Sequence, residues 1–318
     1  MAGMNHHTDQ SVEDAMRLEL AEGDAVIGTF GPILRHLLVN DDHSLFSDET
    51  VARVRGMVAG IALQLLHAQA DAAEAEEPED YVEDRLEGLS EAMLGNTALL
   101  GHLHALALEW QLAERLQVRT GLDPVLSPLL QALIASSDAE TATSAMAALA
   151  GQARFVQSLR RMELSLPELP GDLFHSTLVT MRTLAGQEDE LAAQTAEAAL
   201  RAEFDESRSR LGLLARLVTG MGGGAIAALS VSHAGVAIFL SALAIGCGQS
   251  RDLAVLSTHD RQLARLALAL RAAGLQPAAV EEQLIFLHPD IVLPDGFEQL
   301  RSERAAALLT ASAPFVGG

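Results

Sequence analysis

The feature that most limits how this chain can fold is a stretch without formal charge, residues 217–250, which lies between Arg216 and Arg251. The stretch is 34 residues long, and 18 of these residues are Gly, Ala or Ser. A helix needs about 20 apolar residues to cross a bilayer, so length alone permits a membrane span. A nucleotide-binding loop and the core of a folded protein are the other structures that such a stretch can form.

The residues around this stretch disfavour a membrane span. No Trp or Tyr borders it, and arginines are equally numerous on its two sides, so neither the aromatic belt nor the charge asymmetry of a spanning helix is present. A hairpin that turned at Ser232 and His233 would leave arms of about 15 residues, which are too short to cross. Reversible contact of residues 217–250 with a membrane surface is kept as an alternative.

The glycines at the start of the stretch resemble a nucleotide loop only in spacing. Gly220–Ala225 fits G-x-G-x-x-A, but that fingerprint works between a strand and a helix, and the residues before it have a helical pattern. No acidic residue follows at the distance at which one binds the ribose. We therefore expect no nucleotide or other cofactor, and we predict that residues 217–250 form a central buried apolar helical hairpin.

Composition predicts the fold class. The chain is 49% hydrophobic but only 3% aromatic, and most of its apolar residues are Ala and Leu, which favour helices. We predict an all-α protein, a multi-helix array of αα-hairpins. The tetrapeptide LAGQ occurs at 149–152 and 184–187, 35 residues apart, and this spacing also allows a solenoid-like arrangement of helix pairs.

The distribution of acidic residues and the positions of Pro and Gly predict the domain organisation. Residues 71–91 contain ten acidic residues and one Arg, with Pro78 among them. The sequence predicts an N-terminal helical unit over 1–70, an acidic linker or helix start over 71–85, and a larger helical body over 86–318 that includes 217–250. In the first unit, Gly31 and Pro32 predict a turn or a helix start.

One helix of the first unit has a clear apolar face. Residues 48–70 place apolar side chains three and four positions apart, which is the spacing of one helix face. These side chains are Val51, Val54, Val58, Ile61 and Leu65.

The charge of the chain excludes several classes of function. The formal net charge is −22, and all 21 basic residues are Arg. Without Lys there is no Schiff-base nucleophile and no P-loop. The acidic balance disfavours nucleic acid as a partner, and residues 266–287, which have the outline of a helix-turn-helix, carry Glu281 and Glu282 where a DNA reader needs hydrogen-bond donors.

A few residues allow predictions of the cellular compartment and of metal binding. Cys247 is the one cysteine, so no internal disulfide forms, and the polar first 24 residues do not resemble a signal peptide; we expect a reducing cytoplasm. His102 and His104 lie two positions apart, so on a helix they point in different directions and cannot share a metal ion. We predict no metal site and find no catalytic motif.

The uncharged stretch also supplies the candidate residues for a pocket. If a small molecule binds, the predicted lining is Gly222, Gly223, Gly224, His233 and Cys247, with Arg251 at the mouth.

These observations favour one function and leave two alternatives. The favoured function is a helical scaffold or regulator that binds another protein and carries out no catalysis. The first alternative is a peripheral membrane protein that uses residues 217–250 as a conditional anchor. The second is a small-molecule-binding protein or enzyme with an apolar pocket near His233.

Overall fold

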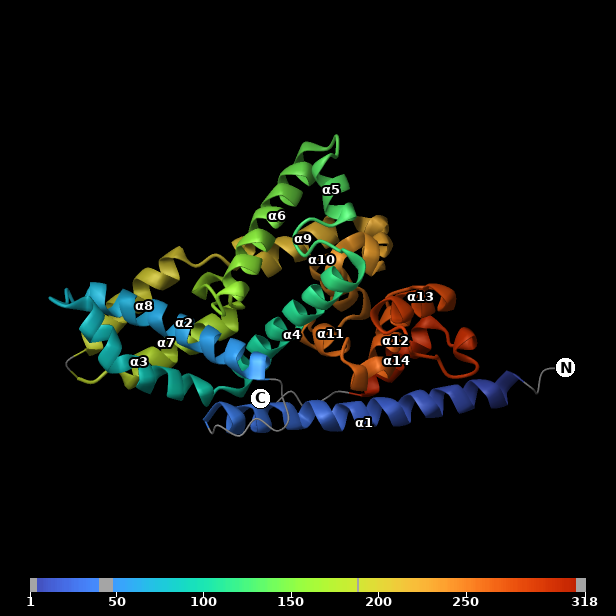
Figure 1. Cartoon of the computed structure of the whole chain (residues 1–318), viewed down its shortest axis with the longest axis horizontal. Helices are drawn as coiled ribbons and strands as arrows, with labels where there is room; N and C mark the ends of the chain where they lie inside the picture. Colours follow the sequence, from blue (N-terminus) through green and yellow to red (C-terminus); the bar gives the residue numbers. More distant parts are fainter. Residues whose placement is uncertain (1–4, 40–47, 188, 313–318) are drawn as a thin grey trace. The chain divides into compact units, whose positions relative to one another are not determined.

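The structure is a computed structural model, and it describes residues 5–39, 48–187 and 189–312 (Figure 1). It is 80% helical, and the described residues form no strand, so the predicted all-α class is confirmed.

The chain forms two compact units, each assembled from separate segments of sequence. Unit 1 contains Met1–Phe30, Leu108–Ala150 and Leu214–Gly318, and unit 2 contains Gly31–Ala107 and Gly151–Leu213. The boundary predicted at residues 71–85 therefore differs from the structure, because that segment lies inside unit 2.

Four α-helices begin in one unit and end in the other. They are α1 (Asn5–Val39), α4 (Thr97–Thr120), α6 (Ala139–Arg160) and α9 (Arg210–Gly220).

The remaining elements belong to a single unit each. Unit 2 contains α2 (Asp48–Ala72), α3 (Pro78–Leu94), the short 3-10 helix η1 (Leu166–Glu168), α7 (Gly171–Leu184), α8 (Glu190–Glu203) and η2 (Glu206–Arg208). Unit 1 contains α5 (Pro128–Ile134), η3 (Gly222–Leu229), α10 (Val231–Cys247), α11 (Arg251–Leu256), η4 (Asp260–Gln262), α12 (Leu263–Ala272), α13 (Pro277–Leu287), η5 (Phe297–Gln299) and α14 (Ser302–Ala311).

Helix α2 supplies the core of unit 2. The apolar face predicted for it is confirmed, since all five of its side chains are buried. This face packs against α3, α7 and α8, which lie beside α2 in Figure 1. Proline at the first position of α3 has no backbone N–H to satisfy, which is why the chain can restart as a helix there.

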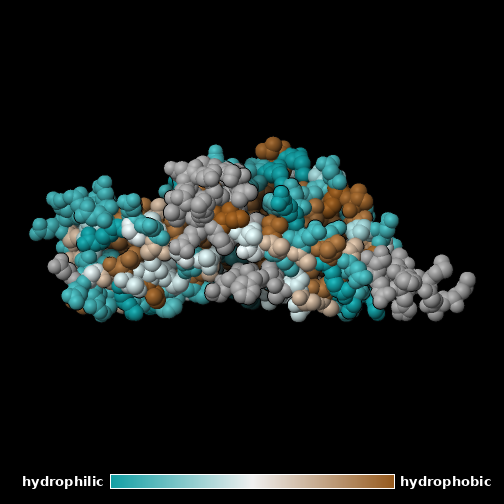
Figure 2. Space-filling model, turned by 90° about the horizontal axis from the view of Figure 1, so that it is seen from below, coloured by the Kyte–Doolittle hydropathy of each residue, from teal (hydrophilic) through white to brown (hydrophobic). Residues whose placement is uncertain are grey.

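Of the two alternatives predicted for the acidic segment, a linker or a helix start, the structure has the helix start, since α3 begins at Pro78 and takes part in this packing. Helix α3 buries Val82, Leu89 and Met93, and it turns its carboxylates outward. In Figure 2 hydrophilic residues cover the end of unit 2 that carries the connection between α2 and α3. A high density of charge therefore marks an exposed helix face in this chain.

Helix α10 lies at the centre of unit 1. Its residues from Ala234 to Ala244 are buried, and it packs against η3, α5, α11, α12 and α13. The predicted central apolar hairpin is thus buried in one arm. The other arm, η3, is mostly exposed, and its Ile226 side chain is 60% exposed.

Gly235 interrupts helix α10 near its start. It has a φ of +73°, which L-residues with a side chain rarely adopt. A Cβ at this position would lie 2.8 Å from the Cβ of Ser127, the residue that caps α5. The backbone bends there so that α10 and α5 can approach closely.

The solenoid-like repeat is not confirmed. In a solenoid each repeat contacts its neighbours along the chain. Here α2 packs against α8, and α10 packs against α5 and α13, all of which are distant in sequence.

The turn predicted at Gly31 and Pro32 is also absent. Helix α1 runs through both residues to Val39. Its buried side chains continue on the same stripe on either side of the proline; they are Val12, Met16, Leu20, Ile27 and Leu34.

Among the described residues, no single helix has both the length and the apolar character needed to cross a membrane. The bent pair of α9 and η3 meets these criteria only when the two helices, which meet at 116°, are taken together.

Candidate functional site

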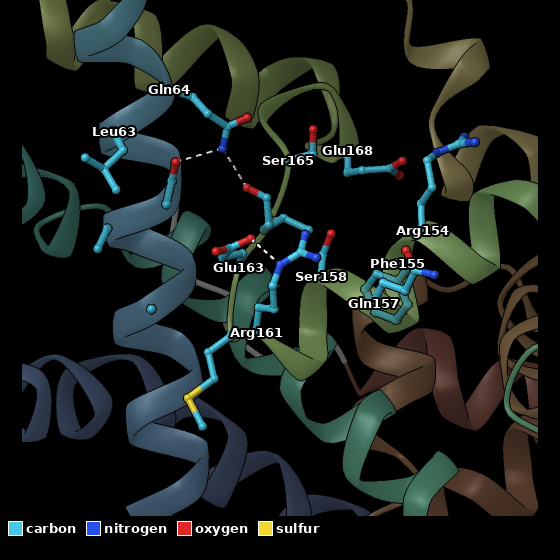
Figure 3. Close-up of a pocket in the computed structure, with 15 residues that line it drawn as sticks. Leu63, Gln64, Arg154, Phe155, Gln157, Ser158, Arg161, Glu163, Ser165 and Glu168 are labelled. Atoms are coloured by element: carbon cyan, nitrogen blue, oxygen red, sulfur yellow. Dashed lines mark hydrogen bonds and ion pairs between the residues drawn. The ribbon is translucent and has the colours of Figure 1, made fainter. Parts of the chain in front are cut away.

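A groove of about 630 Å³ crosses unit 2 between α2 and the chain segment that runs from the end of α6 to η1 (Figure 3). We call it the α2–α6 groove. The groove is open to solvent, since Arg154 and Gln157 in its lining are exposed, so a chain segment can enter it.

Small residues of α2 form the floor of the groove. Gly56, Ala59, Gly60 and Leu63 are partly exposed, and their spacing of three, one and three places them on one face of the helix. The buried apolar face of α2 lies on its other side. Because two of the four residues lack a side chain, the loop after α6 can lie close to the backbone of the helix.

The last turns of α6 form one wall. Arg154, Gln157, Ser158 and Arg161 follow the same helical spacing and line the groove, while Phe155 is buried beneath them. The wall is polar because α6 is amphipathic.

Arg210 packs against the buried side of this wall. The guanidinium of Arg210 stacks 3.5 Å from the centre of the Phe155 ring and donates a hydrogen bond to Oε1 of Gln152 at 3.1 Å. These contacts fix the aromatic ring beneath the wall of the groove.

The end of α6 is tied to α2 by a buried arginine. Arg53 donates hydrogen bonds to the backbone oxygen of Leu159 and, at 2.7 Å, to the carboxylate of Glu49. The last carbonyls of a helix have no partner within the helix, and cationic side chains stabilise them. Arg53 therefore fixes the C-terminal end of α6 on α2.

Gln64 fixes the loop that follows α6. Its amide nitrogen donates to the backbone oxygens of Gly60 at 2.7 Å and Leu164 at 2.8 Å (Figure 3). Its amide oxygen accepts from the N–H of Leu166 at 2.8 Å. One side chain thus satisfies three backbone groups and clamps the loop to the helix.

The loop also contacts α2 directly. Met162 has a φ of +59°, a left-handed conformation that is unusual for a residue with a side chain. Its backbone oxygen lies so close to Gly56 that a Cβ on that glycine would be 2.4 Å away. These contacts hold the groove in one shape without a ligand.

Some charged side chains of the groove have a partner of opposite charge or a hydrogen bond, and one has neither. Arg161 pairs with Glu163 at 2.9 Å, and the carboxylate of Glu168 accepts the backbone N–H of Arg210 at 2.7 Å at the start of α9. The guanidinium of Arg154 is exposed and has no hydrogen bond or ion pair with any residue that the structure describes.

Three further polar side chains in the groove have no described partner. They belong to Gln157, Ser158 and Ser165. The groove therefore offers a cation, an amide and two hydroxyls to a ligand. These groups suit the groove to hydrogen bonding and ion pairing.

The residues predicted to line a pocket lie elsewhere, in unit 1. Gly222, Gly223 and Gly224 are exposed in η3, and His233 is exposed in the first turn of α10. Cys247 is half-buried at the end of α10, where burial raises the pKa of its thiol.

Arg251, which was predicted to lie at the mouth of a pocket, instead connects α11 to α4 and α10. It forms a bidentate ion pair with the carboxylate of Glu109, with both nitrogen–oxygen distances 2.8 Å, and it donates to the hydroxyl of Ser241 at 3.1 Å. The cavities described in this chain, of about 630 and 180 Å³ in unit 2 and about 580 Å³ in unit 1, are lined by other residues.

Sequence reasoning missed the α2–α6 groove. The helical stripe of small residues in α2 was a visible signal, but its partner segment begins about 100 positions later, and periodicity does not reveal which distant segments meet. Among the described residues, no three His, Cys, Asp or Glu side chains lie close enough together to hold a metal ion.

Comparisons with known proteins identify no relative. No family model matches the chain, and the comparisons with the curated proteins and with the solved structures found no match.

Proposed function

We propose that this protein is a helical interaction protein and that the α2–α6 groove binds an extended, carboxylate-bearing segment of a partner protein. The observation that carries the proposal is the exposed guanidinium of Arg154, which has no described partner and lies in a groove whose shape is fixed. Arginine binds carboxylates through paired hydrogen bonds.

The dimensions of the groove suit an extended peptide. Gly56 and Leu63 are seven positions apart, and so are Arg154 and Arg161, which corresponds to about 10 Å along each helix. Three residues of an extended chain cover about the same length. The amide and hydroxyls of the wall can form hydrogen bonds with the main chain of such a peptide.

The polarity of the groove favours a peptide over a drug-like small molecule. Pockets for small molecules are mostly apolar and enclose the ligand. Here the wall is polar and the groove is open to solvent. A peptide that lies across the groove would gain hydrogen bonds along its length and one ion pair at Arg154.

Peptide selection tests this proposal. Random peptides displayed on phage are selected against the immobilised full chain, and parallel selections use Arg154→Glu and the control Arg160→Glu. Arg160 is exposed on the last turn of α6 but does not line the groove. We expect peptides enriched in Asp or Glu, which Arg154→Glu binds at least about tenfold more weakly, because a charge-assisted hydrogen bond contributes about 1.5–3 kcal/mol.

Two results would contradict the proposal. One is a selection that yields no enriched peptide. The other is a set of peptides that bind Arg154→Glu and Arg160→Glu equally well, since that would place binding outside the groove.

The exposed apolar helix η3 favours a second candidate function, reversible contact with a membrane. Its Ile226 is 60% exposed, and the pair formed by α9 and η3 has the length and apolar character of a broken span. Flotation of the full chain with phosphatidylcholine vesicles tests this candidate. We expect Ile226→Asp to reduce flotation and Val118→Asp, at a position 89% exposed outside η3, to leave it unchanged; equal flotation of the two variants would exclude a role for η3.

A further inference from the structure

Unit 2 has a second cavity, of different chemistry, between α2, α3 and α7. It measures about 180 Å³. Its lining is mainly apolar and includes Leu66, Leu89, Met181 and Leu184. The first three of these are buried, whereas Leu184 is 50% exposed at the mouth. We call this cavity the α3–α7 pocket.

The size of the α3–α7 pocket fits one large apolar side chain. An apolar cavity of about 150 Å³ inside a protein accommodates a benzene ring. The pocket is therefore large enough for a Leu, Met or Phe side chain but too small for a peptide backbone. Most of the energy of a protein interface comes from a few such anchors in fitted pockets.

Gly88 keeps the mouth of the pocket open. It lies in the middle of α3 and lines the pocket, and a Cβ at this position would meet no other atom within 4 Å. A glycine inside a helix costs about 1 kcal/mol relative to Ala, and no close packing in unit 2 requires one here. The missing side chain leaves a passage from solvent to the apolar lining.

The cation beside the pocket is already paired. Arg85 donates to Oδ2 of Asp189 from two nitrogens, at 3.2 and 3.0 Å, and its guanidinium lies 3.7 Å from the centre of the Tyr81 ring. Burial, together with the charge of Asp189, raises the pKa of the Tyr81 hydroxyl, so the tyrosine stays neutral. This cluster forms a rigid border and offers no free positive charge.

The border on the other side is strongly negative. Ten acidic residues lie between 71 and 91, and with Arg85 as the one basic residue the formal charge of this segment is −9. All ten are exposed, and none forms a side-chain hydrogen bond or ion pair with a residue that the structure describes. Asp84 and Glu91 precede and follow Gly88 by four and three positions, so they lie on the same face of α3 as the passage.

From this juxtaposition we infer that the α3–α7 pocket is a docking site for a basic amphipathic segment of a partner protein. One large apolar side chain of the segment enters the pocket past Gly88, and Arg or Lys residues within one turn of it meet Asp84, Glu91 and the neighbouring carboxylates. The apolar pocket provides the anchor, and the charge of α3 decides which partner is accepted.

The proposal does not depend on the α2–α6 groove. The two sites share no lining residue, and they suit segments of opposite charge. Arg154→Glu should therefore leave binding at the α3–α7 pocket unchanged, and the failure of one proposal would not decide the other.

A set of peptides of one design tests the inference. Each is a fluorescein-labelled helical peptide that carries four Arg residues around a single variable position, which is Leu, Met, Phe, Ala or Asp. Binding to the full chain is measured by fluorescence anisotropy at low and at high salt. We expect the best of the Leu, Met and Phe peptides to bind at least about tenfold more tightly than the Ala peptide, and the affinity of all of them to fall as salt is added.

Variants of the chain distinguish the contribution of the apolar anchor to binding from that of the acidic residues. Gly88→Leu fills the passage and should reduce binding of the anchored peptides to the level of the Ala peptide. Asp84→Asn with Glu91→Gln should weaken every peptide and reduce the salt dependence. The matched control, Glu281→Gln with Glu282→Gln, neutralises two exposed carboxylates on α13 and should change neither.

Three outcomes would overturn the inference. They are equal binding of the Leu, Met, Phe and Ala peptides, equal loss in the α3 and α13 double variants, and no measurable binding of any peptide. Circular dichroism and thermal unfolding of each variant show that it is folded. A second copy of the chain as the occupant would be revealed by a concentration-dependent mass that Gly88→Leu abolishes, and that result would also overturn the inference.

Discussion

The contact between Gly56 and the loop after α6 can be tested by a pair of substitutions on the same helix. Gly56 and Gly60 both lie on the floor of the α2–α6 groove, one turn apart. A Cβ at Gly56 would be 2.4 Å from the backbone oxygen of Met162, whereas a Cβ at Gly60 would have the backbone nitrogen of Leu164 as its nearest neighbour, at 3.8 Å. The first distance is a severe clash with backbone, and the second is an ordinary van der Waals contact.

The magnitudes follow from these distances. Replacing Gly by Ala inside a helix stabilises it by about 0.5–1 kcal/mol, and this gain applies equally to both positions. Overpacking a tight contact costs about 1–3 kcal/mol and applies only at Gly56. We therefore expect Gly60→Ala to be more stable than the wild type by about 0.5–1 kcal/mol. Gly56→Ala should be less stable than Gly60→Ala by about 1–3 kcal/mol, since the helix propensity cancels between the two.

Urea unfolding of the full chain, followed by far-UV circular dichroism, measures this difference. The free energies of unfolding of the two variants and of the wild type are compared at the same pH and salt. If Gly56→Ala were as stable as Gly60→Ala, the loop would not be held against α2, and the groove would lack the fixed shape on which the proposed function depends.

Three further predictions concern unit 1. Glu109→Gln removes the charge that pairs with the largely buried Arg251 and should lower the free energy of unfolding by about 3–5 kcal/mol in urea; a loss below about 1 kcal/mol would mean that the pair is solvated. Cys247 should react with a disulfide reagent at mildly alkaline pH more slowly than the unfolded chain does, because burial raises the pKa of its thiol and reduces the thiolate; equal rates would contradict this. The guanidinium of Arg304 lowers the pKa of Glu13 below its ordinary value of 4.5, so this pair stabilises the fold above that pH, and its contribution is lost as the pH falls through the folded pKa. Glu13→Gln should therefore show a smaller acid-induced fall in melting temperature than the wild type, and an identical fall would refute the assignment.

Local patterns in the sequence were enough to predict the fold class and several helices. The apolar face of α2 could be predicted because its five side chains repeat at the helical period, and burial follows from that period alone. The sequence failed where a contact joins distant positions. The partner of Arg251 is Glu109, 142 positions earlier, and no spacing rule connects them.

The uncharged stretch shows why composition is a partial guide. Residues 217–250 were predicted to be buried together because none of them is charged. The structure buries α10, which fits against Ser127 of α5 at the bend at Gly235, and it exposes most of η3. His233 precedes this bend and is exposed, which the periodicity of a straight helix would not indicate.

Charge averaged over the chain hides the surface that matters most for recognition. A net charge of −22 over 318 residues suggests a generally acidic protein, yet −9 of it falls within residues 71–91. The same composition supports two interpretations of that segment, a solvated linker or one face of a packed helix. The buried side chains of Val82, Leu89 and Met93 decide between them. Once α3 is fixed by its apolar side, its carboxylates are held beside the opening at Gly88, and the proposed binding of a basic segment would relieve the repulsion among them. A flexible linker with the same charge would attract a basic partner but could not provide a pocket for its apolar anchor.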